Sequence, residues 1–267
     1  MGHLRLVVRV VLLGGFTLVS YLFLLVTSLA VAFFQKDAAR WRARVLSGWA
    51  RHTARLIGMR IRVKGAPPEA PFFLVANHLG YVDILVLASE GPCAFIAKAE
   101  VARWPVVGAL CRSVNTLFIS RESKRDIPGV VLGIEAVLGR GVGVVLFPEA
   151  TSSAGTTVLP FRPALLEAAA RTRMPVSYAT LTYRTPPDAS PAHLSVCWWG
   201  DMTFGRHLQG LLRLRSFDAM VTFGRERILE ENRKILAERL RSAVEAQFEP
   251  VLEVGEENRT APATHGS

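Results

Sequence analysis

A histidine and an aspartate five residues apart, His78 and Asp83, have the side chains and the spacing for acid–base chemistry. An imidazole that is oriented by a carboxylate can take a proton from an alcohol near neutral pH. The pair is therefore a candidate general base with its orienting acid. From these two residues alone the alternative is structural, with Asp83 capping a helix and His78 in an ordinary loop.

The segments around this pair predict a strand, a turn and a helix. Residues 72–76 form a short apolar run of the kind found in buried strands. The apolar pattern resumes at residues 81–87, with Asp83 in what would be the first turn of a helix. We therefore expect His78 on a turn that follows a buried strand, close to the amino terminus of a helix.

Strands and helices are predicted to alternate along the rest of the chain. This alternation predicts an α/β fold, with a mixed, mostly parallel sheet flanked by helices. The 267 residues are ample for one such domain with its own core. The other expected strands are 61–64, 95–98, 113–120, 142–147, 176–183, 194–199 and 219–223, and the other expected helices are 41–59, 104–108, 127–140, 163–173 and 225–248.

Polar side chains end three of the predicted strands: Asn77 with His78, Arg121, and Glu149 with Thr151. Ligands bind beyond the carboxyl ends of the strands in open α/β sheets, so these clusters can converge on one site. Arg121 would supply a fixed cation for a phosphate or carboxylate. Glu149 could accept a hydrogen bond from a substrate hydroxyl.

The amino-terminal segment is strongly apolar. No charge occurs from Val10 to Phe34, which is long enough to cross a bilayer core of about 30 Å as one helix. The pair Gly14-Gly15 would instead divide it into a hairpin within one leaflet. The basic amphipathic helix that follows suits either the membrane interface or packing on the domain. More basic residues follow the apolar segment than precede it, which places the main domain on the cytoplasmic side of the inner membrane.

The charge distribution points to an anionic partner. The formal net charge is +10, and the mean hydropathy is +0.28. Residues 226–267 carry nine acids and six basic residues, so the excess of positive charge lies in the rest of the chain. Because the amino terminus is apolar and no nucleic-acid motif is present, we expect anionic membrane lipids and no nucleic acid. Three cysteines without a C-x-x-C pair predict neither a disulfide framework nor a zinc site.

These patterns divide the chain into five expected parts. They are a membrane segment at 1–35, the basic amphipathic helix at 36–60, the main domain at 61–225, a carboxyl-terminal helix at 226–250 and a disordered tail at 251–267.

Three sequence blocks resemble those of the glycerolipid acyltransferases. Residues 77–83, NHLGYVD, match the N-H-x-x-x-x-D block. Residues 116–121, TLFISR, look like the second block, and residues 147–153, FPEATSS, look like the third, which is usually F-P-E-G-T. The match runs in the right order from about Ala70 to Tyr183. The chain is therefore similar to the lysophosphatidic acid acyltransferase family.

The resemblance implies a membrane-bound O-acyltransferase. His78 would remove the proton from a lysolipid hydroxyl, and Asp83 would hold the imidazole, so that the hydroxyl attacks an acyl thioester directly. No acyl-enzyme is expected, and the nucleophile motif G-x-S-x-G is absent from the sequence. The implied acceptor is lysophosphatidic acid, acylated at its sn-2 hydroxyl to phosphatidic acid. Acyl-CoA or acyl carrier protein would donate the acyl group, and no metal or cofactor is expected.

The resemblance also assigns four substrate-binding residues. Lys98 and Arg121 match positions that contact the acceptor's phosphate in this family. Glu149 and Thr151 match the block that shapes the acceptor site.

Several residues depart from the family pattern. Ala150 stands where glycine is usual, and if this position needs a positive φ, alanine costs on the order of 1 kcal/mol. Ser152 stands where many members have arginine, which weakens phosphate binding or indicates an acceptor without that phosphate. The fourth block, commonly P-V-x-P-V, lacks its second proline at residues 175–179.

Other acceptors and another class of function stay open. Residues 198–202, WWGDM, followed by His207, resemble a segment of the branch that includes lyso-ornithine lipid acyltransferases. The structural alternative is a turn capped by Asp201, with His207 on the surface. The acceptor could thus be a lyso-ornithine lipid or a lysophosphatidylcholine-like molecule. A non-catalytic lipid-binding protein is the other reading, although a binding protein needs no positioned base.

Overall fold

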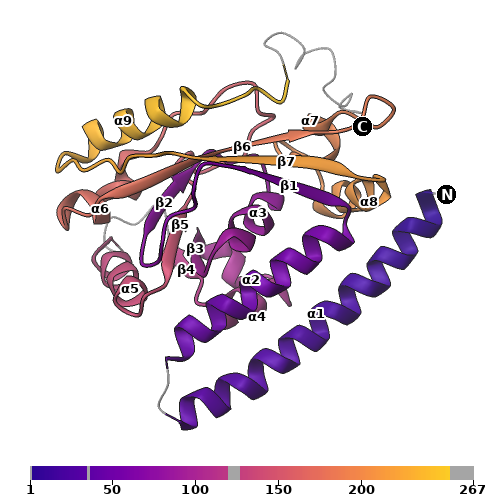
Figure 1. The fold of residues 1–267 in the computed structure, drawn as a ribbon, viewed down its shortest axis with the longest axis horizontal. Coiled ribbons are helices and arrows are strands. Elements are labelled where there is room, and N and C mark those ends of the chain that lie inside the picture. Colours follow the sequence, from indigo (N-terminus) through magenta and orange to yellow (C-terminus); the bar gives the residue numbers. More distant parts are fainter. Residues whose placement is uncertain (1, 35–36, 120–126, 253–267) are drawn as a thin grey trace.

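The computed structural model describes residues 2–34, 37–119 and 127–252, which contain a seven-stranded sheet of order β1-β7-β6-β2-β5-β3-β4 (Figure 1). Its strands are β1 (Met59–Lys64), β2 (Phe73–Ala76), β3 (Cys93–Lys98), β4 (Leu117–Ile119), β5 (Gly143–Leu146), β6 (Val176–Arg184) and β7 (Phe217–Phe223).

The sheet is mixed and mostly parallel, which confirms the predicted fold class. β6, β2, β5, β3 and β4 run in one direction, whereas β7 is antiparallel to β6, and β1 is parallel to β7. The carboxyl ends of β2, β5 and β3 therefore lie at one edge of the sheet. His78 follows β2, Glu149 follows β5 and Lys98 ends β3, so all three are at this edge.

Helices cover both faces of the sheet (Figure 1). α2, α3 and α8 pack over one face, and α5, α6 and α9 pack over the other. The helices are α1 (Gly2–Phe33), α2 (Ala38–Leu56), α3 (Val82–Glu90), α4 (Val107–Ser113), α5 (Ile127–Gly139), α6 (Glu167–Arg171), α7 (Ala192–Ser195), α8 (Phe204–Arg213) and α9 (Arg233–Glu245), with the 3-10 turns η1 (Ala99–Arg103) and η3 (Pro163–Leu166).

The strands at the centre of the sheet are buried on both faces. Every residue of β2 and of β5 is buried, which explains their unbroken apolar runs. Along β2, Leu74 faces the core under α2 and α3, and Phe73 and Val75 face the core under α5 and α9. This double packing fixes the end of β2, and with it the turn that carries His78.

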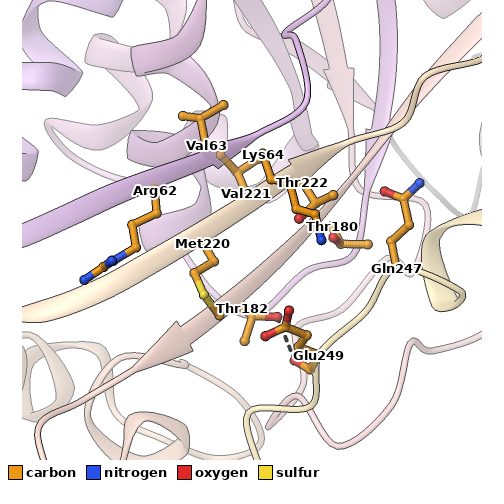
Figure 2. A pocket seen from close by; sticks show the side chains of 10 residues that line it. All are labelled: Arg62, Val63, Lys64, Thr180, Thr182, Met220, Val221, Thr222, Gln247 and Glu249. Atoms are coloured by element: carbon orange, nitrogen blue, oxygen red, sulfur yellow. Dashed lines mark hydrogen bonds between the residues drawn. The ribbon is translucent and has the colours of Figure 1, made fainter.

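The strands β1 and β7, at one side of the sheet, are more exposed than its central strands. Buried and half-buried residues alternate along β7, as expected for a strand with one face in the core. A small hollow of about 100 Å³ lies on the other face, between β1, β7 and β6 (Figure 2). Thr180, Thr182 and Thr222 line it, and it contains none of the residues predicted to bind substrate.

α1 and α2 form an antiparallel pair. The indole of Trp41 donates to the hydroxyl of Thr27 at 2.8 Å, and that of Trp49 donates to Thr17 at 3.1 Å. α1 is continuous, as in the expectation of one helix, and the alternative division at Gly14-Gly15 is wrong. By length and composition α1 can cross a membrane, and only 6% of its most apolar window is buried.

The amino-terminal turns of α1 are joined to α8. Arg5 donates to the carbonyl of Arg213 at 2.7 Å, and Arg9 donates to the carbonyl of Leu214 at 2.5 Å. Carbonyl groups at the carboxyl end of a helix have no partner within the helix and carry partial negative charge, so arginine suits them. α1 is thus attached to the domain at this end as well as along α2.

The strand predicted at residues 194–199 is wrong. α7 (Ala192–Ser195) occupies its first part, and an irregular segment follows. Val196 and Cys197 are fully buried in the core beside α2 and α3. A buried irregular segment and a buried strand give the same short apolar run, which explains the error.

Three other elements differ in extent from their predictions. The helix expected at 104–108 is α4 (Val107–Ser113), preceded by η1, and the strand expected at 113–120 is confined to 117–119 in the described residues. The helix expected from residue 225 begins at Arg233. Its start is set by Asn232, whose side-chain oxygen accepts hydrogen bonds from the first helical N–H groups.

Candidate active site

The turn that carries His78 is fixed by its neighbour Asn77. The Asn77 amide donates to the carbonyl of Leu181 at 3.0 Å and accepts from the Leu181 N–H at 2.7 Å. These two bonds join the end of β2 to β6. The His78 ring stacks on Phe147, with ring centroids 4.3 Å apart. The backbone and the ring of His78 are thus both positioned before any substrate binds.

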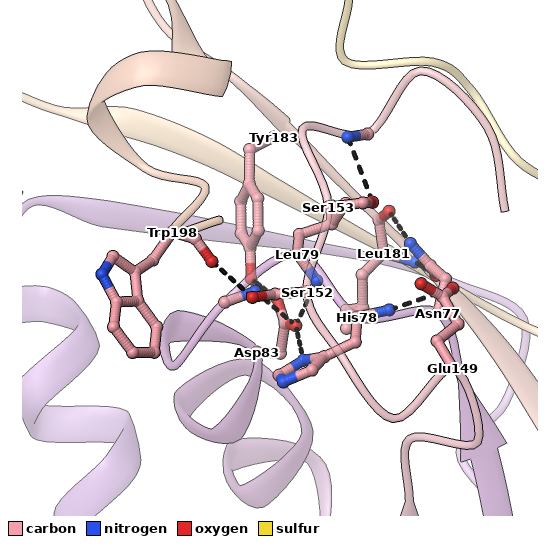
Figure 3. A network of polar contacts seen from close by, with 12 residues as sticks. Asn77, His78, Leu79, Asp83, Glu149, Ser152, Ser153, Leu181, Tyr183 and Trp198 are labelled. Carbon is pink, nitrogen blue, oxygen red and sulfur yellow. Dashed lines mark hydrogen bonds and ion pairs between the residues drawn. The ribbon is translucent and has the colours of Figure 1, made fainter. Parts of the chain in front are cut away.

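Asp83, in the first turn of α3, is fully buried and is surrounded by hydrogen-bond donors (Figure 3). Oδ2 accepts from Nδ1 of His78 at 2.7 Å, from the N–H of Leu79 at 2.7 Å and from the N–H of Gly80 at 3.0 Å. A buried carboxylate requires such partners. The bond to Nδ1 places the imidazole proton on that nitrogen and leaves Nε2 as a base. The His78 side chain is 23% exposed, so a substrate can reach it.

Tyr183, on β6, completes this network and was not predicted from the sequence as a site residue. Its phenol donates to Oδ1 of Asp83 at 2.6 Å, and its side chain is fully buried (Figure 3). Burial raises the pKa of Tyr183, and the nearby Asp83 charge raises it further, so the phenol stays a donor. The sequence offered one signal for Tyr183: it is a tyrosine at the carboxyl end of a predicted strand, in the same predicted sheet as residues 72–76.

The loop after β5 holds the backbone of His78 from both sides. Oε1 of Glu149 accepts from the His78 N–H at 3.3 Å, and the N–H of Ser153 donates to the His78 carbonyl at 3.0 Å. Glu149 is 3% exposed, and burial raises its pKa to about 9, so it is protonated at neutral pH. The bond expected between Glu149 and a substrate hydroxyl stays a prediction.

Ala150 adopts a left-handed backbone conformation, with φ of +66°. Glycine is usual at this position in the family that the chain resembles. Because φ is positive here, the strain expected for an alanine at this position is present. The Ala150 side chain is buried in the core under α5 and α9. Its methyl group thus has packing that glycine would lack.

Ser152 holds the segment that contains residues 198–202 against the histidine turn. Its hydroxyl donates to the carbonyl of Trp198 at 2.5 Å, and the Trp198 N–H donates to the carbonyl of Leu79 at 2.8 Å (Figure 3). A Cβ on Gly80 would lie 2.8 Å from the Trp198 nitrogen, so glycine allows this close approach. Trp198 is therefore packed against the turn that carries His78.

Trp198 belongs to an aromatic cluster. Tyr81 contacts Trp198 and Phe204 with centroid separations of 6.0 and 5.1 Å. The Tyr81 hydroxyl also lies 2.9 Å from Nδ1 of His207. His207 is buried, so the surface position considered for it is wrong, and burial lowers its pKa. A neutral His207 thus links α8 to the start of α3.

The three remaining predicted substrate-binding residues are Lys98, Thr151 and Arg121. Lys98 is exposed at the end of β3, and Thr151 is exposed in the loop after β5. Both are at the sheet edge that carries His78. Arg121 lies outside the described residues. In the described ranges, no group of three or more His, Cys, Asp or Glu side chains is arranged to hold a metal ion.

The chain is similar to known acyltransferases in sequence and in fold. A family model described as Acyltransferase matches residues 60–181. A lyso-ornithine lipid O-acyltransferase of Brucella abortus is 35% identical over 232 residues, covering 82% of this chain and 87% of the relative. A 1-acyl-sn-glycerol-3-phosphate acyltransferase of Neisseria gonorrhoeae is 35% identical over 171 residues, covering 60% of this chain and 66% of the relative. The crystal structure of the 1-acyl-sn-glycerophosphate (LPA) acyltransferase PlsC from Thermotoga maritima shares the fold, with a TM-score of 0.65 and 21% identity over 92% of this chain and 97% of that one.

Proposed function

The chain belongs to the glycerolipid acyltransferase family, and from this premise we propose that it transfers a fatty acyl group from an acyl thioester to the hydroxyl of a lysolipid. The observation that carries the chemistry is the 2.7 Å bond between Nδ1 of His78 and Asp83. It orients an accessible imidazole whose Nε2 can accept a proton. A protein that only binds lipid has no need of a base held in this way.

The reaction follows from this geometry in two steps. Nε2 of His78 removes the proton of the acceptor hydroxyl as its oxygen attacks the thioester carbonyl carbon, and Asp83 stabilises the resulting imidazolium. The carbon–sulfur bond then breaks, and the leaving thiolate takes the proton from the imidazolium. An ester and a free thiol are formed, and His78 returns to its starting state. Acyl-CoA or acyl carrier protein would supply the thioester.

A lyso-ornithine lipid is our first choice of acceptor. The Ser152 hydroxyl donates to the Trp198 carbonyl. Many members of the family that the chain resembles have an arginine at this position. A phosphate would therefore meet one cation fewer here, whereas an ornithine head group has no phosphate. The relative with 87% of its length covered is also named for this acceptor.

Lysophosphatidic acid is the second candidate. Lys98 supports it, because an exposed cation at the end of β3 stands at the same sheet edge as His78. Arg121 matches a phosphate-contacting position of the family that the chain resembles, and it would add a second cation. Lys98 and Arg121 are thus the proposed phosphate contacts.

We place the reaction at the membrane surface. α1 exposes a broad apolar face, with Val11, Leu22, Val26 and Leu29 among its most exposed side chains. This face suits hydrocarbon, and the positively charged region after α1 suits the cytoplasmic leaflet of the inner membrane. A lysolipid could then reach His78 without leaving the bilayer surface.

The function is tested by the release of free thiol from acyl-CoA by purified protein in detergent, with each acceptor in turn. We expect turnover with lyso-ornithine lipid to exceed that with lysophosphatidic acid, and His78→Ala to lower it by about 10²–10⁴. His3→Ala, which alters an exposed histidine of α1, is the matched control. Full activity of His78→Ala would reject the mechanism, and a preference for lysophosphatidic acid would reject the acceptor alone.

A further inference from the structure

A groove of about 340 Å³ lies between α1, α2 and α4. Its leucines come from α1, and its two arginines come from α2 and α4. α1 contributes Leu24, Leu25 and Ser28, α2 contributes Arg42, and α4 contributes Arg112 and Ser113.

The basic side of the groove holds two guanidinium groups without an acidic partner. Neither Arg42 nor Arg112 forms an ion pair with any residue in the described ranges. One nitrogen of Arg112 donates to the carbonyl of Ala102 at 2.6 Å, which positions this side chain. Two arginines that line one groove and have donors to spare suit a phosphate group.

A buried hydroxyl faces the same groove. Ser28 is 9% exposed, and its oxygen has no hydrogen-bond partner among the described residues. Its neighbour Thr27, by contrast, donates to the carbonyl of Phe23 at 2.6 Å and accepts from Trp41. A buried polar group without a partner is costly. A ligand oxygen in the groove would satisfy Ser28.

The apolar side of the groove is continuous with the exposed face of α1. Leu25 lines the groove and is 42% exposed, and Leu22, Val26 and Leu29 beside it are more exposed still. A ligand that fills the groove must therefore present an anionic group to the arginines and an apolar chain to α1. Basic pockets between membrane helices bind anionic lipid head groups in this way.

We propose that this groove binds one anionic phospholipid of the surrounding bilayer. Its phosphate lies between Arg42 and Arg112, and one acyl chain runs along Leu24 and Leu25. The bound lipid bridges α1 to α4 and so fastens the amino-terminal helix to the domain. This proposal does not depend on the identity of the acceptor.

The groove is separate from the candidate active site. Asn115, two residues before β4, donates to the carbonyl of Ala39, which lies less than one helical turn before Arg42. The groove is thus associated with the amino end of β4, whereas His78 follows the carboxyl end of the parallel strand β2. None of the described candidate active-site residues lines the groove, and we therefore assign the lipid a role apart from that of acceptor or product at His78.

Native mass spectrometry of the full chain in detergent tests the proposal. The His78→Ala background keeps the result independent of catalysis, and the probes are phosphatidylglycerol and phosphatidylcholine with identical chains. We expect one phosphatidylglycerol to bind at least about tenfold more tightly than phosphatidylcholine. The double variant Arg42→Gln, Arg112→Gln should lose this preference. Ser28→Leu should weaken binding without a change of charge, because it fills the groove.

The charge-matched control is Arg44→Gln, Arg55→Gln, which alters two exposed arginines of α2 outside the groove. It should keep the preference. Equal loss in both double variants would show a general surface effect and overturn the proposal, as would a preference that survives in the groove variant. Displacement of the lipid by chain-free glycerophosphoglycerol would make this a simple anion site, and displacement by acyl-CoA would make it a donor site. Either result also overturns the proposal.

Discussion

The phenol of Tyr183 lies 2.6 Å from Oδ1 of Asp83, and both side chains are fully buried, although the two residues are 100 positions apart in the sequence. The second carboxylate oxygen, Oδ2, is the one bonded to His78. Tyr183 thus fixes the plane of the carboxylate and, through it, the direction of the imidazole. It acts on the reaction as a positioning residue.

Removing the Tyr183 hydroxyl should slow catalysis. Tyr183→Phe leaves Oδ1 of Asp83 buried without its donor, which costs about 1–3 kcal/mol. We expect kcat to fall about tenfold with little change in the KM for the acceptor, and the pH–rate profile to shift. Tyr178→Phe, on the same strand, is the control. If kcat and the pH profile stay at the wild-type values while only thermal stability falls, Tyr183 has a structural role alone.

Replacing the orienting acid should be more severe. In Asp83→Asn a neutral amide replaces the carboxylate. If its NH₂ group takes the place of Oδ2, it cannot accept from His78, Leu79 and Gly80; if its oxygen takes that place, the negative charge that stabilises the imidazolium is still lost. In the first arrangement the imidazole also loses its fixed tautomer, and in either one we expect kcat to fall about 10²–10⁴. Steady-state thiol release measures the loss, and a thermal melt shows that the variant is folded. A folded variant with near wild-type kcat would contradict the role of Asp83.

Glu149 predicts a dependence of stability on pH. Its pKa is about 9 in the folded protein against an ordinary value of 4.5. Between these values the unfolded chain has released a proton that the folded chain retains, so stability falls as pH rises from about 4.5 to 9. In Glu149→Gln this contribution is absent, and the variant should gain stability relative to wild type between pH 5 and pH 8. Denaturant unfolding at both pH values checks this, and an equal difference at each would refute it.

Substitutions of Ala150 can distinguish the cost of backbone strain from the gain of side-chain packing. Glycine relieves about 1 kcal/mol of strain at this positive φ but loses a buried methyl group worth about 0.8 kcal/mol, so Ala150→Gly should be nearly neutral. Ala150→Val adds a β-branched side chain to the same conformation and should destabilise the protein by about 1–3 kcal/mol. Thermal melts of both variants test this. Equal stability of the two would rule out strain at residue 150.

Ser152 should control the choice of acceptor. Ser152→Arg breaks the bond to the Trp198 carbonyl and adds a cation, so the kcat/KM ratio of lysophosphatidic acid to lyso-ornithine lipid should rise about tenfold. Ser152→Ala removes the bond without adding a charge, so the difference between the two variants isolates the effect of the cation. A ratio that moves equally in both variants would assign the change to Trp198 and not to the new cation.

The part of the site that is local in the sequence could be predicted. His78 and Asp83 are joined by one turn, so their spacing together with a strand-to-helix pattern was enough to bring them into contact. Tyr183 could not be found in this way, because its contact depends on β6 lying beside β2. That strand order follows from three-dimensional packing, and no local pattern encodes it.

The strand predicted at residues 194–199 was wrong for a related reason. Val196 and Cys197 are apolar because the core surrounds them, and their pattern is the same in a strand and in a buried loop. The role of Ser152 was likewise visible only as a missing arginine. Its actual partner is the backbone carbonyl of Trp198. Every residue has such a carbonyl, so the sequence does not indicate this contact.

The attachment of α1 to α8 through Arg5 and Arg9 has a practical consequence for anyone who wishes to produce this enzyme without detergent. Deleting α1 removes more than an anchor. It strips the donors from the last carbonyls of α8, the helix whose His207 contacts Tyr81. A shortened version would carry a frayed carboxyl end on the helix that packs against Tyr81. A water-soluble form is better sought by replacing the exposed apolar side chains of α1 with polar ones while keeping Arg5 and Arg9.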